Sequence, residues 1–137
     1  MPELNFTPEQ RAAIDTRGST VLVSAAAGSG KTRVLTERLM AYLTDAENPA
    51  DIDRFLVITY TRAAAAELRS RILDGIYARI ASDPENRRLR RQAALCAHAE
   101  IGTIHSFCAD FLRANCAALA LAPDFQVADT ERCAALR

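Results

Sequence analysis

Short apolar runs recur along the chain and predict three buried β-strands, at Thr20–Ser24, Phe55–Thr59 and Ile101–Ile104. Apolar residues at helical spacing predict helices between and after these runs, at Thr32–Thr44, Ala63–Ala81, a stretch that follows Pro84, and Phe107–Ala118. Parallel strands need a crossover connection, so strands that alternate with helices indicate βαβ units. The predicted fold class is therefore α/β, with a parallel sheet that helices cover on both faces.

Both ends of the chain carry helix-capping signals. Near the N-terminus, Thr7 is a candidate N-cap, Pro8 suits the first helical position, and Gln10 completes a capping box three residues after the threonine. Near the C-terminus, Asp129 or Thr130 is a candidate cap for a last helix. These signals predict a short helix before the first strand and another at the end of the chain.

The composition is that of one soluble globular domain. The 137 residues are 50% apolar and 25% charged, which is ordinary for such a domain and enough to build a core. No apolar run approaches the roughly 20 residues that a membrane span requires. The first ten residues lack the basic and apolar regions of a signal peptide. We therefore expect a cytoplasmic protein.

The cysteines do not indicate a metal site. Cys96, Cys108, Cys116 and Cys133 follow no zinc-binding spacing, either with one another or with the two histidines. In a cytosolic chain the expectation is buried free thiols.

The charge pattern draws attention to one residue. The formal net charge is zero, so overall electrostatics does not point to nucleic acid. However, sixteen of the 17 basic residues are arginine, and the only lysine is Lys31. Lysine binds phosphate as a compact point charge, a role in which arginine does not simply replace it. Lys31 is therefore a candidate phosphate ligand.

The segment around this lysine, Ala25–Thr32 (AAAGSGKT), matches the phosphate-binding pattern G-x-x-x-x-G-K-[ST], except that its first position is alanine. Small residues let backbone N–H groups converge on phosphates, and the following helix adds the positive end of its dipole. In such a loop Lys31 reaches the β- and γ-phosphates and the Thr32 hydroxyl binds Mg²⁺. The alternative is a glycine-rich turn that binds nothing. The position between a predicted strand and a predicted helix favours the phosphate loop.

Four segments together resemble consecutive motifs of UvrD-type superfamily 1 DNA helicases, namely FTPEQRAAI, VLVSAAAGSGKTRVLTERL, LVITYTRAAAAELRSRI and IGTIHSFCADFLR. They occur in the family's order and cover most of the chain. Residues Leu121–Asp129 resemble the AddA branch, the helicase–nuclease subunit of the AddAB complex, with RecB-like and single-subunit UvrD-like helicases as alternatives. The resemblance implies that residues 1–137 form part of a RecA-like P-loop NTPase domain, with ATP and Mg²⁺ as its ligands.

The resemblance also implies the members of a nucleotide site: Gln10, Ala25, Ala26, Ala27, Gly28, Ser29, Gly30, Lys31, Thr32 and Arg33. Lys31 and Thr32 carry the catalytic roles, and Thr32 meets the nucleotide-bound Mg²⁺. Gln10 matches the glutamine that reads the adenine edge, but one amide cannot fully serve both adenine and the capping box. Arg33 matches an arginine beside the nucleotide, and an exposed helix arginine is the alternative.

A second implied site contacts single-stranded DNA through Thr59, Thr61, Arg62, Ala63, Thr103, His105 and Ser106. Hydroxyls and backbone amides can hold phosphates there, and Arg62 adds charge. Ligands of α/β sheets bind at the carboxyl ends of strands, which supports this location. An ordinary strand-to-helix turn is the alternative, and for His105 a structural hydrogen bond.

Two other charged features are interpreted as structural. The run Arg87–Arg91 is expected to be a solvated helix face rather than a track for a phosphate backbone. Glu67 lies within a matched motif but receives no catalytic role, because one carboxylate there is not a catalytic constellation.

Helicase chemistry also needs an acidic pair that holds Mg²⁺ and positions water, and the chain contains no Asp-Glu dipeptide. We therefore expect a piece of a longer enzyme, poorly stable or prone to aggregation alone because sheet edges and apolar surface stay open. The leading hypothesis is an ATP-dependent 3′-to-5′ DNA helicase/nuclease subunit that acts at duplex ends in double-strand break repair. Its expected partner is an AddB-like nuclease subunit.

Other functions remain as alternatives at this point. One is a helicase without that nuclease partner. Another is a non-catalytic module that binds nucleotide and single-stranded DNA. A P-loop kinase or GTPase is disfavoured, because the guanine-reading pattern N-K-x-D is absent.

Overall fold

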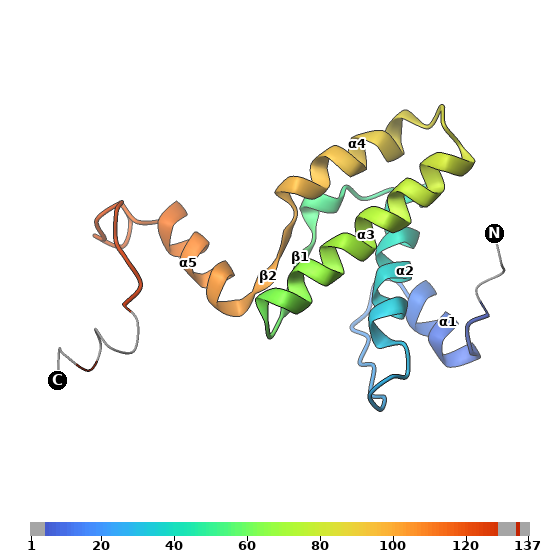
Figure 1. Ribbon diagram of the computed structural model, residues 1–137, viewed down its shortest axis with the longest axis horizontal. Helices are drawn as coiled ribbons and strands as arrows, with labels where there is room; N and C mark the ends of the chain where they lie inside the picture. Colours follow the sequence, from blue (N-terminus) through green and yellow to red (C-terminus); the bar gives the residue numbers. More distant parts are fainter. Residues whose placement is uncertain (1–4, 129–133, 135–137) are drawn as a thin grey trace.

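Helices dominate the described part of the protein, and two short strands lie among them there (Figure 1). The structure is a computed structural model that describes residues 5–128 and 134. In chain order the elements are α1 (Pro8–Asp15), α2 (Lys31–Leu43), the 3₁₀ turn η1 (Ile52–Arg54), β1 (Leu56–Thr59), α3 (Arg62–Ser82), α4 (Arg87–Leu95), the 3₁₀ turn η2 (Cys96–His98), β2 (Glu100–Thr103) and α5 (Ile104–Ala114). Within this described part, no helix is both long and apolar enough to cross a membrane.

The two strands form a parallel sheet in which Leu56 pairs with Glu100 and Thr59 pairs with Thr103. Helices α3 and α4 make the crossover from β1 to β2, as parallel strands require. This arrangement confirms the predicted α/β class with a parallel sheet flanked by helices. It also brings the carboxyl ends of β1 and β2 to the same edge of the sheet.

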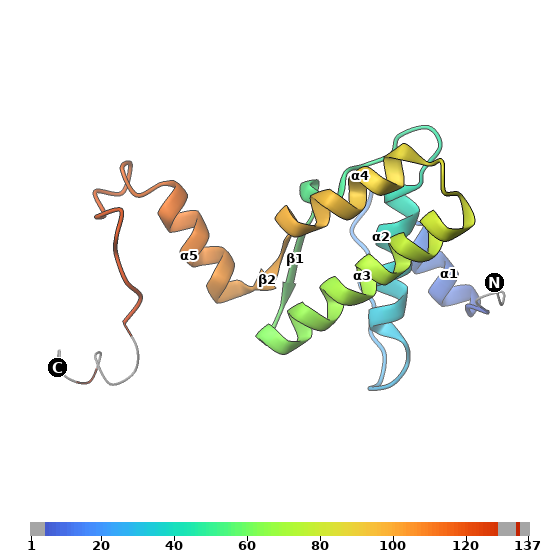
Figure 2. The same ribbon diagram turned by 45° about the horizontal axis from the view of Figure 1, so that its top comes forward.

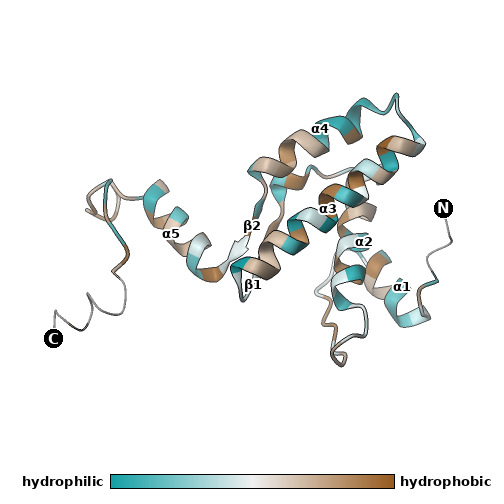
Figure 3. Ribbon diagram, in the orientation of Figure 1, coloured by the Kyte–Doolittle hydropathy of each residue, from teal (hydrophilic) through white to brown (hydrophobic). Residues whose placement is uncertain are grey.

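A large apolar cluster joins α2, α3 and the sheet. Met40 and Leu43 on α2 meet Ile72 and Ile76 on α3, and all four side chains are fully buried. Along α3, hydrophilic and hydrophobic residues alternate (Figure 3), because one side of this helix faces the core. Burial of each such side chain contributes roughly 1.5–3 kcal/mol. The complete cluster is Leu39, Met40, Leu43, Ile52, Val57, Leu68, Ile72, Ile76, Cys96, Ala99 and Ile101.

A smaller cluster packs α1 against α2. Ala13 and Ile14 of α1 are buried with Val34 of α2, and Phe6 and Val21 pack against them. Since α2 begins at Lys31, within the predicted phosphate loop, this cluster fixes α1 beside that loop.

The predicted strand at Thr20–Ser24 does not form. These residues join no sheet ladder, and Leu22 is 93% exposed. A strand needs a hydrogen-bonded neighbour, and the described residues offer this segment none. The prediction that helices cover both sheet faces is also wrong for this part of the chain, because Leu56 and Ile58 are 50% and 43% exposed while Val57 faces the core.

The predicted helix at Phe107–Ala118 begins and ends earlier than expected. Thr103, the last residue of β2, is itself the N-cap of α5, so the helix follows the strand without a loop. Residues 115–120 form turns after the helix ends. In both views α5 projects away from α1–α4 (Figure 1 and Figure 2) and buries none of its residues. The candidate caps Asp129 and Thr130 lie outside the described residues.

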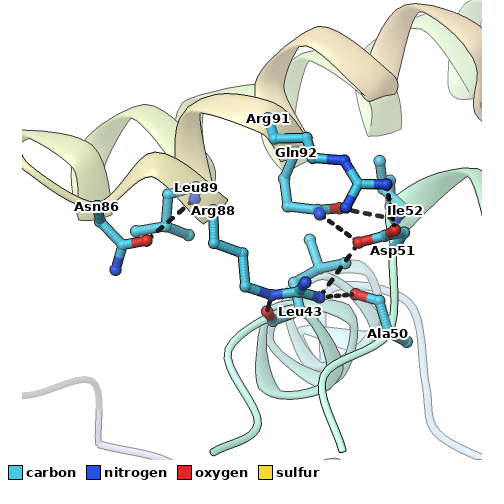
Figure 4. Close-up of polar contacts among 9 residues, drawn as sticks. All are labelled: Leu43, Ala50, Asp51, Ile52, Asn86, Arg88, Leu89, Arg91 and Gln92. Atoms are coloured by element: carbon cyan, nitrogen blue, oxygen red, sulfur yellow. Dashed lines mark hydrogen bonds and ion pairs between the residues drawn. The ribbon is translucent and has the colours of Figure 1, made fainter.

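The basic run on α4 serves a structural purpose in part (Figure 4). Arg88 and Arg91 form ion pairs with Asp51, at N–O distances of 3.3 and 2.9 Å. The Arg88 guanidinium also donates to the carbonyl oxygens of Leu43 and Ala50. The interpretation of residues 87–91 as a solvated face is therefore wrong for Arg88, which is half-buried, whereas Arg91 is exposed as expected. Both arginines tie α4 to the connection between α2 and β1.

Gln92 completes this contact from the same helix. Its Oε1 accepts a hydrogen bond from the buried Ile52 N–H at 2.8 Å, and its Nε2 donates to Asp51 Oδ1 at 2.6 Å. The hydrogen bond from Gln92, followed by the charges of Arg91 and Arg88, holds the pKa of Asp51 below its ordinary value. The amide thus joins a buried backbone donor to a charged carboxylate.

Candidate functional site

The predicted phosphate loop forms an open bend whose shape depends on two glycines. Gly28 and Gly30 have φ angles of 77° and 85°, a region that side chains rarely adopt. Gly30 is the N-cap of α2, and no side chain caps this helix. Its first N–H groups therefore lack the side-chain acceptor that closes α1, α3 and α5 in the described structure. The bend presents a helix N-terminus suited to an anion.

Lys31 folds back over this bend. Its Nζ donates to the carbonyl oxygens of Ala25 and Ala26, both at 2.6 Å. The residue is nevertheless exposed, and an ammonium group has three donors. Thr32, which follows it, is exposed as well. The Lys31 ammonium thus lies within the bend and is accessible to a ligand.

Gln10 of α1 contacts the same bend. Its Oε1 accepts from the Thr7 N–H at 3.0 Å, and Thr7 Oγ1 accepts from the Gln10 N–H at 3.3 Å, which confirms the predicted capping box. Its Nε2 donates to the Ser29 carbonyl oxygen at 3.1 Å. Both ends of the amide are therefore engaged within the protein, and an adenine would have to displace at least the contact with Ser29. The adenine-reading role stays a prediction.

Arg33 is exposed, but it is not a free surface arginine. Its guanidinium carbon lies 4.8 Å from the centroid of the Phe6 ring, and that of Arg11 lies 5.2 Å from the same ring. Such cation–π contacts hold both charges near the start of α2. Sequence reasoning missed Phe6 and Arg11, although the phenylalanine directly precedes the capping box.

A cleft of about 660 Å³ lies beside the bend, between α1 and residues 21–25, and reaches Gln10 and Lys31. One of its walls is the segment predicted as a strand. The cleft therefore reflects the exposed side of that segment, and we assign no ligand to it.

The second predicted site lies where β1 and β2 end. Thr61 Oγ1 accepts from the Ala64 N–H at 3.1 Å and caps α3, while Thr103 Oγ1 accepts from the Ser106 N–H at 3.2 Å and caps α5. Because Thr59 and Thr103 are partners in the parallel ladder, the N-termini of two helices meet at one edge of the sheet. Their dipoles favour negative charge at this edge.

The other predicted contact residues surround these caps. Arg62, Ala63 and His105 are exposed. Thr59 Oγ1 donates to the Thr61 carbonyl oxygen at 3.0 Å, which shapes the turn between β1 and α3. Tyr60 lies in the same turn and is 100% exposed, which sequence reasoning did not single out. The fold thus brings the two predicted DNA-contacting segments together and adds an aromatic ring.

Gly102 is required beside the α5 cap for a different reason from the loop glycines. A Cβ atom at this position would lie 2.6 Å from Ser106 Oγ. Ser106 Oγ already accepts from the Thr103 N–H at 2.9 Å. The glycine therefore permits the close approach of the Ser106 side chain to the end of β2.

The described thiols differ in environment. Cys96 is buried, and burial raises the pKa of its thiol. Cys116 is half-buried, whereas Cys108 is exposed, so the prediction of buried thiols holds for Cys96 and is wrong for Cys108. Cys133 lies outside the described residues.

The comparison with protein families covers both sites. The profile of the UvrD/REP helicase N-terminal domain matches residues 6–136. The chain belongs to this family. The match includes the phosphate bend and the two strand ends, so the resemblance to UvrD-type helicases is confirmed for nearly the whole chain.

Curated relatives support the AddA-like resemblance. A Clostridium acetobutylicum protein, described as the A subunit of an ATP-dependent helicase/nuclease, is 52% identical over 125 residues, which are 91% of this chain and 10% of the relative. A protein with the same description from Thermoanaerobacter sp. is 52% identical over 90% of this chain. In Clostridioides difficile, another is 45% identical over 100% of this chain and 11% of its own length. The chain thus spans about a tenth of the length of these relatives.

Proposed function

We propose that this chain is the nucleotide-binding and single-strand-binding part of an ATP-dependent DNA helicase/nuclease subunit. The observation that carries the proposal is the position of the Lys31 ammonium, which lies in a glycine bend over an uncapped helix N-terminus. This combination of donors is suited to a polyphosphate. Family membership favours ATP over other polyphosphates.

The residues of the bend fit a magnesium nucleotide. Lys31 would exchange its bonds with Ala25 and Ala26 for the β- and γ-phosphates, and the amides from Gly28 to Thr32 would hold their oxygens. The exposed Thr32 hydroxyl is available to Mg²⁺, which supplies charge neutralisation when bound. Gln10, released from Ser29, would read the adenine edge, and Arg33, packed on the Phe6 ring, would lie beside the nucleotide.

The strand ends would hold the DNA. The two capped helix N-termini and Arg62 present positive potential to phosphates, and the Thr61 hydroxyl retains a proton that it can donate. Tyr60 offers an exposed ring on which a base can stack, and stacking of this kind tolerates any base sequence. Thr59, Ala63, Thr103, His105 and Ser106 shape this surface. We therefore expect binding without base preference.

The activity of the complete protein belongs to this proposal. The family resemblance suggests 3′-to-5′ movement, action on duplex ends in double-strand break repair, and an AddB-like nuclease partner. The 137 residues carry no Asp-Glu pair for positioning water. We therefore expect this chain by itself to bind nucleotide and single-stranded DNA without hydrolysing ATP.

Replacement of Lys31 with alanine tests the nucleotide site. We expect affinity for a fluorescent ATP analogue to fall roughly 10- to 100-fold, because a hydrogen bond to a charged group contributes about 1.5–3 kcal/mol. Arg87→Ala, on the exposed start of α4, is the matched control and should bind normally. Equal affinity of Lys31→Ala and the unaltered chain would refute the site.

A second measurement separates the module from a complete motor. ATP turnover by the isolated chain, with and without single-stranded DNA, should stay at background. Turnover that DNA stimulates would contradict the view that this part binds without hydrolysing.

A further inference from the structure

Arg69 of α3 makes an unusual set of contacts with the segment that leads into β2. One guanidinium nitrogen donates to the Cys96 carbonyl oxygen, and the other terminal nitrogen donates to the carbonyl oxygens of Ala99 and Ile101, both at 3.1 Å. All three acceptors belong to the backbone. A planar guanidinium with five donors suits this arrangement, and the point charge of lysine does not.

The position of Arg69 connects the two predicted DNA-contacting segments. It lies seven residues after Arg62, about 10 Å along α3 at 1.5 Å per residue. Ile101, its last acceptor, lies two residues before Thr103, the cap of α5. The arginine therefore links the helix that starts at one strand end to the strand that carries the other.

The link is stiff for physical reasons. Arg69 is half-buried. Its acceptors are backbone carbonyl groups, which cannot rotate as a side chain can. The flanking residues Leu68 and Ile72 are fully or nearly fully buried in the core. The guanidinium is thus held from its own helix, and it holds the approach to β2 in turn.

We propose that Arg69 is a positioning residue, which sets the end of β2 relative to the start of α3 and so aligns the two capped helix N-termini for one nucleic-acid backbone. This inference rests on the proposed function of the strand ends. It differs from a general stabilising role, because loss of a general stabilising contact would destabilise the P-loop and the strand ends alike.

Three variants of the 137-residue chain test the inference. Arg69→Met keeps the length and apolar stem of the side chain but removes the donors. Arg69→Lys keeps a charge and reaches fewer carbonyls. Arg71→Met is the matched control, because Arg71 lies on the same helix and makes an exposed ion pair with Glu67.

The first readout is hydrogen exchange of individual backbone amides. We expect Arg69→Met to accelerate exchange at Thr103–Ser106 while the amides of α2 keep their protection. Arg69→Lys should give an intermediate rate, and Arg71→Met should leave both regions unchanged. Uniform acceleration over the chain would indicate a merely structural role and overturn the proposal, as would unchanged exchange at Thr103–Ser106.

The second readout is the affinity for a thymidine oligonucleotide compared with that for the ATP analogue. Arg69→Met should weaken oligonucleotide binding about tenfold, equivalent to roughly 1.4 kcal/mol, with nucleotide affinity unchanged. A parallel loss of both affinities would refute the positioning role. If the unaltered chain failed to bind the oligonucleotide, the proposed DNA function would fail, and the exchange data would still decide whether Arg69 positions the strand end.

Discussion

The polar contact between α4 and the start of η1 gives a sharp stability test, through replacement of Gln92 with alanine (Figure 4). The Gln92 side chain is 0% exposed, and so is Ile52, whose N–H it accepts at 2.8 Å. After truncation, water cannot reach this N–H without movement of the helix. A buried donor without a partner costs about 1–3 kcal/mol, and the space left by the side chain adds roughly another 1 kcal/mol.

We therefore expect Gln92→Ala to lower the free energy of unfolding by about 2–4 kcal/mol, a large share of the roughly 5–15 kcal/mol typical of a domain. The assay is urea unfolding of the 137-residue chain followed by circular dichroism. Arg87→Ala, an exposed change on the same helix, should stay within about 0.5 kcal/mol of the unaltered chain.

Replacement of Gln92 with glutamate separates the two hydrogen bonds. Glutamate keeps an acceptor for Ile52 but loses the donor to Asp51 and sets two carboxylates side by side. We expect a loss of stability at neutral pH that shrinks as the new carboxyl becomes protonated. If Gln92→Ala changed stability by less than about 0.5 kcal/mol, the reasoning from the buried donor would be wrong.

Two further predictions concern Asp51 and Gly102. The folded-state pKa of Asp51 lies below its ordinary value, so its stabilising effect is complete above the unfolded-state pKa of about 3.9 and is lost as pH falls through the folded value. The difference in unfolding midpoint between the unaltered chain and Asp51→Asn should therefore be present at pH 7 and shrink below about pH 4; a difference that grows on acidification would contradict the assignment. Gly102→Ala would place a methyl group 2.6 Å from Ser106 Oγ. We therefore expect loss of the α5 capping box, a decrease of about 1 kcal/mol in stability and weaker oligonucleotide binding. Gly18→Ala is the control, because no atom lies within 4 Å but φ is +68°, so it should lower stability and leave the affinity for the oligonucleotide unchanged.

The sequence predicts the local elements of this fold well where the signal is local. The capping box at Thr7 and Gln10 and the long α3 both depend on short-range patterns. The prediction fails at Thr20–Ser24, because a strand exists only with a neighbour, and periodicity along one segment says nothing about the neighbour.

The candidate sites follow the same rule. The glycine bend could be recognised from its spacing, whereas Thr61 and Thr103 are implied by the family resemblance and their capping roles come from the structure. By contrast, the contacts of Arg69 with three carbonyls and of Phe6 with two arginines join residues whose proximity the sequence does not specify. The prediction for the basic run on α4 fails at Arg88 for this reason, since Asp51 lies 37 residues before Arg88 and becomes its partner only through the crossover.

No loop residue separates β2 from α5, so the strand fixes where the helix begins. Thr103 ends the strand and Ile104 begins the helix. A helix turns about 100° per residue, so a single inserted residue here would swing every side chain of α5 around its axis and carry His105 to another side. The same insertion among residues 46–48, which are exposed, would lengthen a surface connection. The number of residues at this junction, more than their identity, therefore determines which way the side chains of α5 face.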